Sequence, residues 1–167
     1  MFDETYRNWK NWTEDNFGRC DEWSSGYFTA ELARIGMTDG MLRVLELGFG
    51  NGRFLRFSRD RGYAVVGVEV NRELCKVASA AGFEVHEDLS GVAGGNFDVV
   101  CAFDVIEHIP QSELPTVFTA VRDALRPGGI FLSRFPNGDS PFGRAFQHGD
   151  LTHVTTLGSG KLWHSPA

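Results

Sequence analysis

The sequence is short of several features that would each point to a particular class of protein. Its three cysteines, Cys20, Cys75 and Cys101, lie far apart and include no Cys-x-x-Cys pair, which argues against a disulfide framework and a zinc knuckle. No stretch approaches the roughly 18 apolar residues of a membrane helix, and the first residues lack the apolar segment of a secretory signal. We therefore expect reduced thiols, no membrane partner and a cytoplasmic location.

Positive charge is also scarce. The chain carries 16 Lys and Arg against 22 Asp and Glu, which gives a formal net charge of −6. Nucleic-acid binders usually present a basic face, so we expect no nucleic-acid partner. A length of 167 residues with 42% hydrophobic and 23% charged residues suits one folded domain with its own core.

From residue 42 onward, short apolar runs alternate with helical segments. The pattern predicts strands at 42–47, 63–70, 83–86, 97–103 and 129–135, and helices at 52–61, 72–80 and 112–125. The Pro-Gly-Gly at 127–129 is expected to end the last helix before its strand begins. Strands that alternate with helices predict an α/β fold over residues 41–135, with a doubly wound, mostly parallel sheet covered on both faces.

The two segments that flank this region differ from it in composition and in the spacing of their apolar residues. Residues 1–40 carry aromatic side chains that often lie three or four positions apart, so we expect one or two amphipathic helices that form a cap. Residues 136–167 hold five glycines and three prolines without a sustained period, so we expect a loop-rich tail.

The most informative segment is V-L-E-L-G-F-G-N-G-R-F at 44–54. A glycine-rich turn between a strand and a helix lets backbone N–H groups approach a ligand at the positive end of the helix dipole. A nucleotide-like ligand is expected there, and the plain alternative is a tight turn without a ligand. The dinucleotide spacing G-x-G-x-x-G fails because Arg53 occupies its sixth position, which weakens a nicotinamide-dependent dehydrogenase.

The spacing acid-x-G-x-G-x-G, with Glu69 ending the next strand, resembles the class I S-adenosylmethionine-dependent methyltransferases. The resemblance implies a Rossmann-like fold and S-adenosylmethionine as the cofactor. It implies that Glu69 accepts both ribose hydroxyls, since a carboxylate offers paired acceptors to a vicinal diol. It implies adenine contacts from Asp88 and Leu89, although an Asp at this position also suits a turn. The implied cofactor-binding residues are Glu46, Gly48, Gly50, Asn51, Gly52, Glu69, Val70, Asp88, Leu89, Phe103 and Asp104.

Residues 97–110, F-D-V-V-C-A-F-D-V-I-E-H-I-P, resemble the small-molecule branch related to ubiquinone-biosynthesis O-methyltransferases. This implies that Phe103 and Asp104 line the cleft and that His108 lies near the transferred methyl group. Asp104, Glu107 and His108 stand at i, i+3 and i+4, so one helical turn would place all three on one side. They would suit a divalent metal, as in some members of that branch, or a water-filled polar rim. We predict no metal.

Residues 135–157 resemble the segment after the fifth strand in bacterial small-molecule methyltransferases. The run Asp-Leu-Thr-His at 150–153 places His153 where it could meet the acceptor, with a loop-capping histidine as the alternative. His108 and His153 are the candidate catalytic bases, because imidazole titrates near pH 6.5. Arg144 and His148 either steer the acceptor or belong to a solvated surface.

The family's sheet normally continues with a helix and two antiparallel strands, which this chain is expected to lack. The chain is therefore a shortened member, a fragment, or a protein that pairs with a second copy through its exposed sheet edge. The leading prediction is methyl transfer from S-adenosylmethionine to an oxygen or nitrogen of a small-molecule acceptor. The alternative is a catalytically silent S-adenosylmethionine-binding partner. The aromatic residues Tyr6, Trp9, Trp12 and Phe17 are expected either to cap the cofactor cleft or to pack against the helices.

Overall fold

The sheet of this protein has five parallel strands. The computed structural model describes residues 8–37, 40–92 and 94–160. The strand order is β3-β2-β1-β4-β5, and every pairing between neighbours is parallel. The direction of winding reverses between β1 and β4, which is where open α/β sheets bind ligands at their carboxyl ends. The strands are β1 (Arg43–Leu47), β2 (Ala64–Val68), β3 (Glu84–His86), β4 (Phe97–Phe103) and β5 (Leu125–Arg134).

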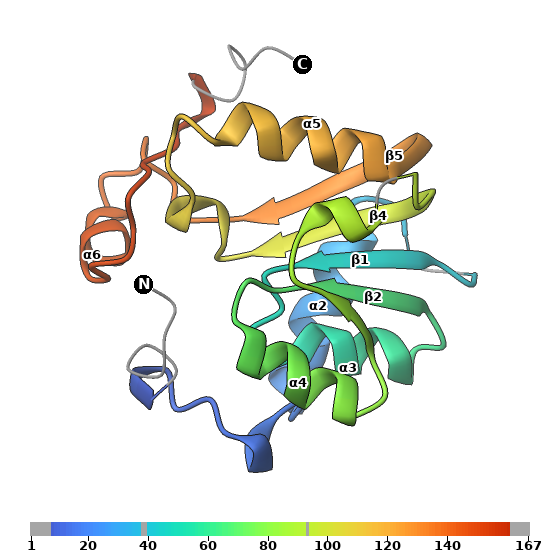
Figure 1. The fold of residues 1–167 in the computed structure, drawn as a ribbon. Coiled ribbons are helices and arrows are strands. Elements are labelled where there is room, and N and C mark those ends of the chain that lie inside the picture. Colours follow the sequence, from blue (N-terminus) through green and yellow to red (C-terminus); the bar gives the residue numbers. More distant parts are fainter. Residues whose placement is uncertain (1–7, 38–39, 93, 161–167) are drawn as a thin grey trace.

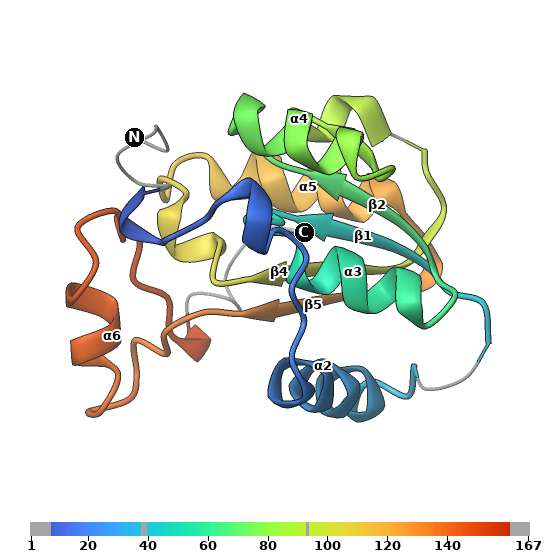
Figure 2. The same ribbon diagram turned by 90° about the horizontal axis from the view of Figure 1, so that it is seen from below.

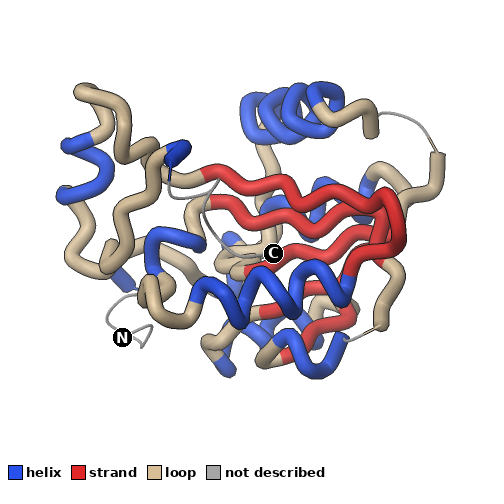
Figure 3. The backbone as a smooth tube through the Cα atoms, turned by 90° about the horizontal axis from the view of Figure 1, so that it is seen from above, coloured by secondary structure: helices blue, strands red, loops and turns tan. Residues whose placement is uncertain are grey.

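Helices cover both faces of this sheet (Figure 3). Figure 2 shows α2 and α3 on one side of the strands and α5 on the other. The predicted doubly wound α/β fold is therefore confirmed. None of the helices within the described ranges has the length and apolar character needed to cross a bilayer. The helices are α2 (Glu22–Arg34), α3 (Arg53–Asp60), α4 (Arg72–Ala80), α5 (Leu114–Ala124) and α6 (Arg144–His148), with short 3-10 turns η1 (Glu14–Asn16), η2 (Leu89–Val92) and η3 (Ile106–His108).

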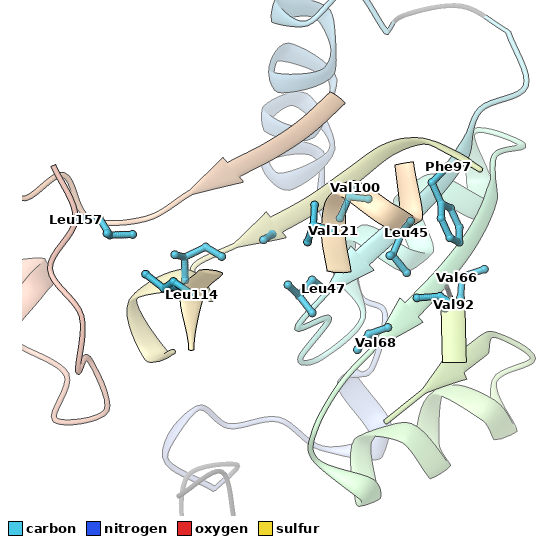
Figure 4. Packing of buried hydrophobic residues seen from close by; sticks show 13 residues of the cluster. Leu45, Leu47, Val66, Val68, Val92, Phe97, Val100, Leu114, Val121 and Leu157 are labelled. Carbon is cyan, nitrogen blue, oxygen red and sulfur yellow. The ribbon is translucent and has the colours of Figure 1, made fainter. Parts of the chain in front are cut away.

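The central strand β1 is buried on both faces because helices lie on both sides of it. Val44 packs into a cluster with Phe28 of α2 and Phe54 of α3. Leu45 and Leu47 belong to the opposite cluster, which includes Val121 of α5 (Figure 4). Val44 and Leu45 have no exposed surface, and full burial of such a side chain stabilises the fold by roughly 1.5–3 kcal/mol.

The junction between α5 and β5 differs from the prediction. The helix ends at Ala124, and β5 begins at once with Leu125, which pairs with Phe97. The Pro-Gly-Gly at 127–129 therefore lies inside the strand. The register shifts between Phe97 and Val99, and a Cβ atom on Gly129 would lie 2.9 Å from the carbonyl oxygen of Phe97. Glycine is needed there because the two backbones approach closely, so its role is to permit a strand irregularity.

The described part of the N-terminal region contains the 3-10 turn η1 and the helix α2. Helix α2 packs against α3 and the sheet through Phe28 and Leu32. The segment that precedes it, residues 8–17, lies near the carboxyl ends of the strands, on the same side as α6 (Figure 1). Of the four aromatic residues expected to cover the cleft, Tyr6 lies outside the described residues.

The described part of the tail after β5 is mostly loop, and it makes specific contacts with the core. It contains the short helix α6, and its residue Leu157 forms a β-bridge with Asn137 and is 3% exposed within the core (Figure 4). The backbone N–H groups of Val154 and Thr155 both donate to the carbonyl oxygen of Glu107. The tail therefore docks on the turn that follows β4.

Candidate active site

Two cavities lie at the carboxyl ends of the strands. The smaller cavity, of about 320 Å³, is lined by residues that include Glu69, Val70, Asp88 and Leu89. The larger cavity, of about 530 Å³, is lined by residues that include Glu46, Asn51, Phe103, Glu107 and His153. Trp12, Gly48, Asp104 and His108 line both cavities, so the two spaces meet at these residues.

The glycine-rich turn between β1 and α3 is held in a conformation that favours glycine. Gly48, Gly50 and Gly52 have φ angles of 69°, 51° and 72°. A Cβ atom on Gly48 would lie 2.5 Å from Val105, and one on Gly50 would lie 2.8 Å from the Trp12 ring. Gly52 instead packs under Phe17 at the start of α3 and lines neither cavity. The third glycine therefore shapes the turn, while the first two border the cavities.

Glu69 lies between the glycine turn and the residue that caps α4. Its side chain is 8% exposed, and its two oxygens accept from the backbone N–H of Gly50 at 3.1 Å and of Asn71 at 3.0 Å. Burial raises the pKa of Glu69 in spite of these hydrogen bonds, which lower it. A carboxylate has about four lone-pair sites, so acceptor capacity remains for a ligand in the smaller cavity.

Asp88 is hydrogen-bonded within its own turn and also borders the smaller cavity. Its Oδ1 accepts from the backbone N–H of Ser90 at 2.8 Å and from the Ser90 hydroxyl, so it forms the turn expected of an Asp here. These hydrogen bonds lower its pKa, the hydroxyl contributing most. Asp88 nevertheless lines the smaller cavity with Leu89 and Val70.

Glu46 is a buried acid that borders the larger cavity. The residue is 4% exposed, and its Oε2 has no hydrogen-bond partner among the described residues. Burial, and secondarily the charge of Glu69, raise its pKa well above the usual value, while a hydrogen bond from the Leu55 backbone lowers it. An orphaned carboxyl oxygen beside a cavity is a ready partner for a cationic ligand group.

Phe103 and Asp104, at the end of β4, are positioned differently from each other. Phe103 packs edge-on against Tyr27 and Phe54 and lines only the larger cavity. Asp104 has a φ of 56° and forms an ion pair with Arg134. Asp104 is exposed and precedes η3, so the expected single helical turn through Asp104, Glu107 and His108 is wrong, although all three residues line the larger cavity.

A cluster of His108, His153 and Glu107 forms where the tail docks. The two imidazole rings lie edge to face with centroids 4.7 Å apart. His153 Nε2 lies 3.9 Å from Glu107 Oε1 and 3.8 Å from Asp150 Oδ2. Burial lowers the pKa of His108, which favours its neutral form, and burial raises the pKa of Glu107 to about 7.

This cluster is also the group that could hold a metal. Glu107, His108 and His153 each offer a ligand atom, and these atoms all lie within 4.8 Å of one another. The Nδ1 atoms of His108 and His153 contact the carbonyl oxygens of Thr152 and Gln147 at 3.2 Å in both cases. A ligand set for a divalent cation would thus contain His153 in place of Asp104.

Several residues at the site carried no signal in the sequence. Arg134 pairs with Asp104, and Lys10 Nζ lies 3.2 Å from Asp150 Oδ2 across 140 positions of chain. Burial would raise the pKa of Asp150, but hydrogen bonds from Thr152 and the nearby Lys10 lower it to about 2. His148 is exposed and lines neither cavity, and the side chain of Arg144 lies outside what the structure describes.

The fold and the glycine turn define a class I S-adenosylmethionine-dependent methyltransferase, and the comparisons with known proteins agree. Residues 6–166 match the family described as "Methyltransferase domain", and the chain belongs to that family. The family expected from the sequence resemblance is therefore confirmed, with S-adenosylmethionine as its cofactor.

Relatives are similar over part of their length. A ubiquinone biosynthesis O-methyltransferase of Idiomarina loihiensis is 32% identical over 109 residues, which are 58% of this chain and 44% of that protein. A probable fatty acid methyltransferase of Mycobacterium tuberculosis is 29% identical, over 72% of this chain and 31% of its own length. The chain thus spans half or less of the length of these two curated relatives.

Solved structures share the fold. A SAM-dependent methyltransferase from Archaeoglobus fulgidus superposes with a TM-score of 0.70 at 23% identity, covering 84% of this chain and 66% of the other. The glycopeptide N-methyltransferase MtfA, solved with S-adenosylmethionine, gives a TM-score of 0.56 at 23% identity, over 67% of this chain and 52% of the other. At 23% identity, the similarity to these two structures shows that the fold is shared.

Proposed function

We propose that this chain transfers a methyl group from S-adenosylmethionine to an oxygen or nitrogen atom of a small-molecule acceptor. The observation that carries the proposal is the junction of the two cavities at Gly48, Asp104 and His108. A bound sulfonium supplies an electrophilic methyl group on a good leaving group. The protein then needs to align the nucleophile with that methyl carbon, and alignment alone can contribute roughly 7–11 kcal/mol.

The smaller cavity suits the adenosine half of the cofactor. Glu69 offers carboxylate acceptors for the ribose diol, while Asp88 and Leu89 supply polar groups for the adenine. Glu46 borders the larger cavity, and its buried Oε2 has no hydrogen-bond partner among the described residues, so its carboxyl group is our candidate for the ammonium of the methionine half. Gly48 and Asn51 complete this set, and Phe103 belongs to the acceptor side.

The larger cavity also suits the acceptor, since His108 and His153 both line it. A hydroxyl acceptor must lose its proton as the new bond to carbon forms, and a neutral imidazole can accept that proton. His108 is the better placed of the two because it lies where the cavities meet. An amine acceptor with a free lone pair would need less help.

Cofactor binding is tested by calorimetry with S-adenosylhomocysteine, with NAD as the negative control. We expect binding of the first and no heat from the second. Binding of NAD without a response to S-adenosylhomocysteine would contradict the proposal.

Methyl transfer is tested by supplying methyl-labelled S-adenosylmethionine with a panel of small hydroxyl and amine acceptors. The double change His108→Ala and His153→Ala is compared with His148→Ala, a histidine outside both cavities. Loss of methyl transfer in the double variant, but not in His148→Ala, supports a role for His108 or His153 as the base. Tight cofactor binding without transfer to any acceptor would instead favour a silent binding partner.

A further inference from the structure

His108 is held from one side by the tail, through a single residue. Its Nδ1 lies 3.2 Å from the carbonyl oxygen of Thr152 and 3.0 Å from the Thr152 hydroxyl oxygen. The Thr152 hydroxyl lies 2.5 Å from Oδ1 of Asp150, which also accepts from the Thr152 backbone N–H at 2.9 Å. Asp150, Thr152 and His108 thus form a continuous chain of polar contacts.

The direction of each hydrogen bond in this chain follows from what the groups can donate. A carboxylate only accepts, so the hydroxyl of Thr152 gives its one proton to Asp150. Toward His108 that hydroxyl then has only lone pairs, and the Thr152 carbonyl also has only lone pairs. Two acceptors therefore face the same ring nitrogen, so Nδ1 of His108 must carry the proton.

We propose that Asp150 and Thr152 are positioning residues that lock His108 in the tautomer with its proton on Nδ1. In the neutral ring this leaves the lone pair on Nε2, the atom that can act on a ligand at the junction of the cavities. The catalytic meaning of this lock rests on the proposed function, in which His108 accepts a proton. The lock itself is a property of the ring and does not depend on any acceptor.

Lys10 extends the chain to the N-terminal segment. Its ammonium lies 3.2 Å from Oδ2 of Asp150, the oxygen that does not bind Thr152, and the Asp150 side chain is 9% exposed. The ion pair thus orients the carboxylate while leaving Oδ1 for the hydroxyl. The histidine tautomer is in this way set by residues from three separate segments of the chain.

The lock is tested by nitrogen-15 NMR of the histidine rings, which reports which ring nitrogen carries the proton. Spectra are recorded at pH 8 in the presence of EDTA, and His108 is assigned by comparison with His108→Gln. In the wild type we expect His108 to be protonated on Nδ1. In Asp150→Ala the freed Thr152 hydroxyl can donate to Nδ1, so the other tautomer should gain population.

Three further variants keep the result interpretable. Thr152→Val removes the hydroxyl but keeps the backbone carbonyl as an acceptor for Nδ1, so the proton should stay on Nδ1, as it should in Thr152→Ser, which keeps both acceptors. Asp139→Ala is the matched control, because Asp139 accepts from the backbone and hydroxyl of Ser159 in the same tail without contacting His108. Melting curves of all variants report whether the tail has come loose.

The possible outcomes separate the lock from the proposed function. A wild-type His108 without its proton on Nδ1, or an unchanged His108 spectrum in folded Asp150→Ala, would overturn the lock. A changed tautomer with a fall in kcat of roughly tenfold or more, at constant affinity for S-adenosylhomocysteine, supports the lock and the base together. A changed tautomer with unaltered turnover of an identified acceptor supports the lock and contradicts the base.

Discussion

The two cavities are built from the sequence in different ways. The smaller cavity takes most of its polar groups from consecutive strand ends, Gly48 after β1, Glu69 after β2 and Asp88 after β3. The larger cavity joins residues 9–12, 103–108 and 145–153, which are far apart in the chain. The smaller cavity repeats one local unit, a strand followed by a turn. The larger cavity forms only when the tail has docked on η3.

This difference shows which contacts fix the geometry of each cavity. The geometry of the smaller cavity is tied to the sheet, whose register fixes the spacing of the strand ends. The larger cavity depends on a few contacts made by exposed segments, such as Lys10 with Asp150. We therefore expect changes in the sheet-bound half to act on cofactor affinity, and changes in the other half to act mainly on acceptor turnover.

The largest effect is expected for Glu69→Ala, which removes the paired acceptors of the smaller cavity. Loss of two charge-assisted hydrogen bonds should weaken S-adenosylhomocysteine binding by roughly 2–3 kcal/mol, as measured by calorimetry. Glu84→Ala, at an exposed position on β3 outside both cavities, is the control and should bind as the wild type does. Affinity within twofold of the wild type in folded Glu69→Ala would show that Glu69 does not hold the ribose.

The next effect is expected for Gly48→Ala, where the two cavities meet. The positive φ and the clash with Val105 should lower the free energy of unfolding by roughly 1–3 kcal/mol in urea denaturation. Gly62→Ala is the matched control, since its φ of 78° is similar but nothing lies within 4 Å of the added Cβ. Equal losses in the two variants would mean that the contact with Val105 has no effect.

A smaller effect on cofactor affinity is expected for Trp12→Ala. The Trp12 ring lies against Gly50 and lines both cavities, so its loss should weaken S-adenosylhomocysteine binding about tenfold, or ~1.4 kcal/mol. Trp23, which is 74% exposed and lines only the larger cavity, provides the control Trp23→Ala. If both variants bind with unchanged affinity, the N-terminal segment packs without capping the cofactor.

The smallest effect is expected for Glu46→Gln and should depend on pH. Burial raises the pKa of Glu46, so the folded state keeps this proton to higher pH than the unfolded state does. Its contribution to stability is therefore complete below pH 4.5 and is lost as the pH rises toward the folded-state pKa. The glutamine has no such proton to lose, so the variant should gain in melting temperature relative to the wild type as the pH rises.

The control for that experiment is Glu84→Gln, an exposed glutamate for which no such change with pH is expected. A constant difference in melting temperature between Glu46→Gln and the wild type from pH 4 to pH 9 would contradict the raised pKa of Glu46 in the folded state.

The sequence determined the α/β core and the glycine turn because both depend on local patterns. The predicted strand at 97–103 and the predicted helix at 72–80 match β4 and α4 to the residue. Apolar runs without polar alternation leave few alternatives to a buried parallel strand. A glycine spacing with an acid at the next strand end likewise restricts the ligand that a turn can accept.

The tertiary structure alone decided which acids and histidines share a site. Helical spacing had placed Asp104 with Glu107 and His108, but Asp104 precedes η3 and pairs with Arg134, so it lines the same cavity without joining their cluster. His153 takes its place because the tail hydrogen-bonds to the Glu107 carbonyl, a contact between segments more than forty positions apart. Such contacts have no period in the sequence, since they depend on how segments far apart in the chain pack against one another.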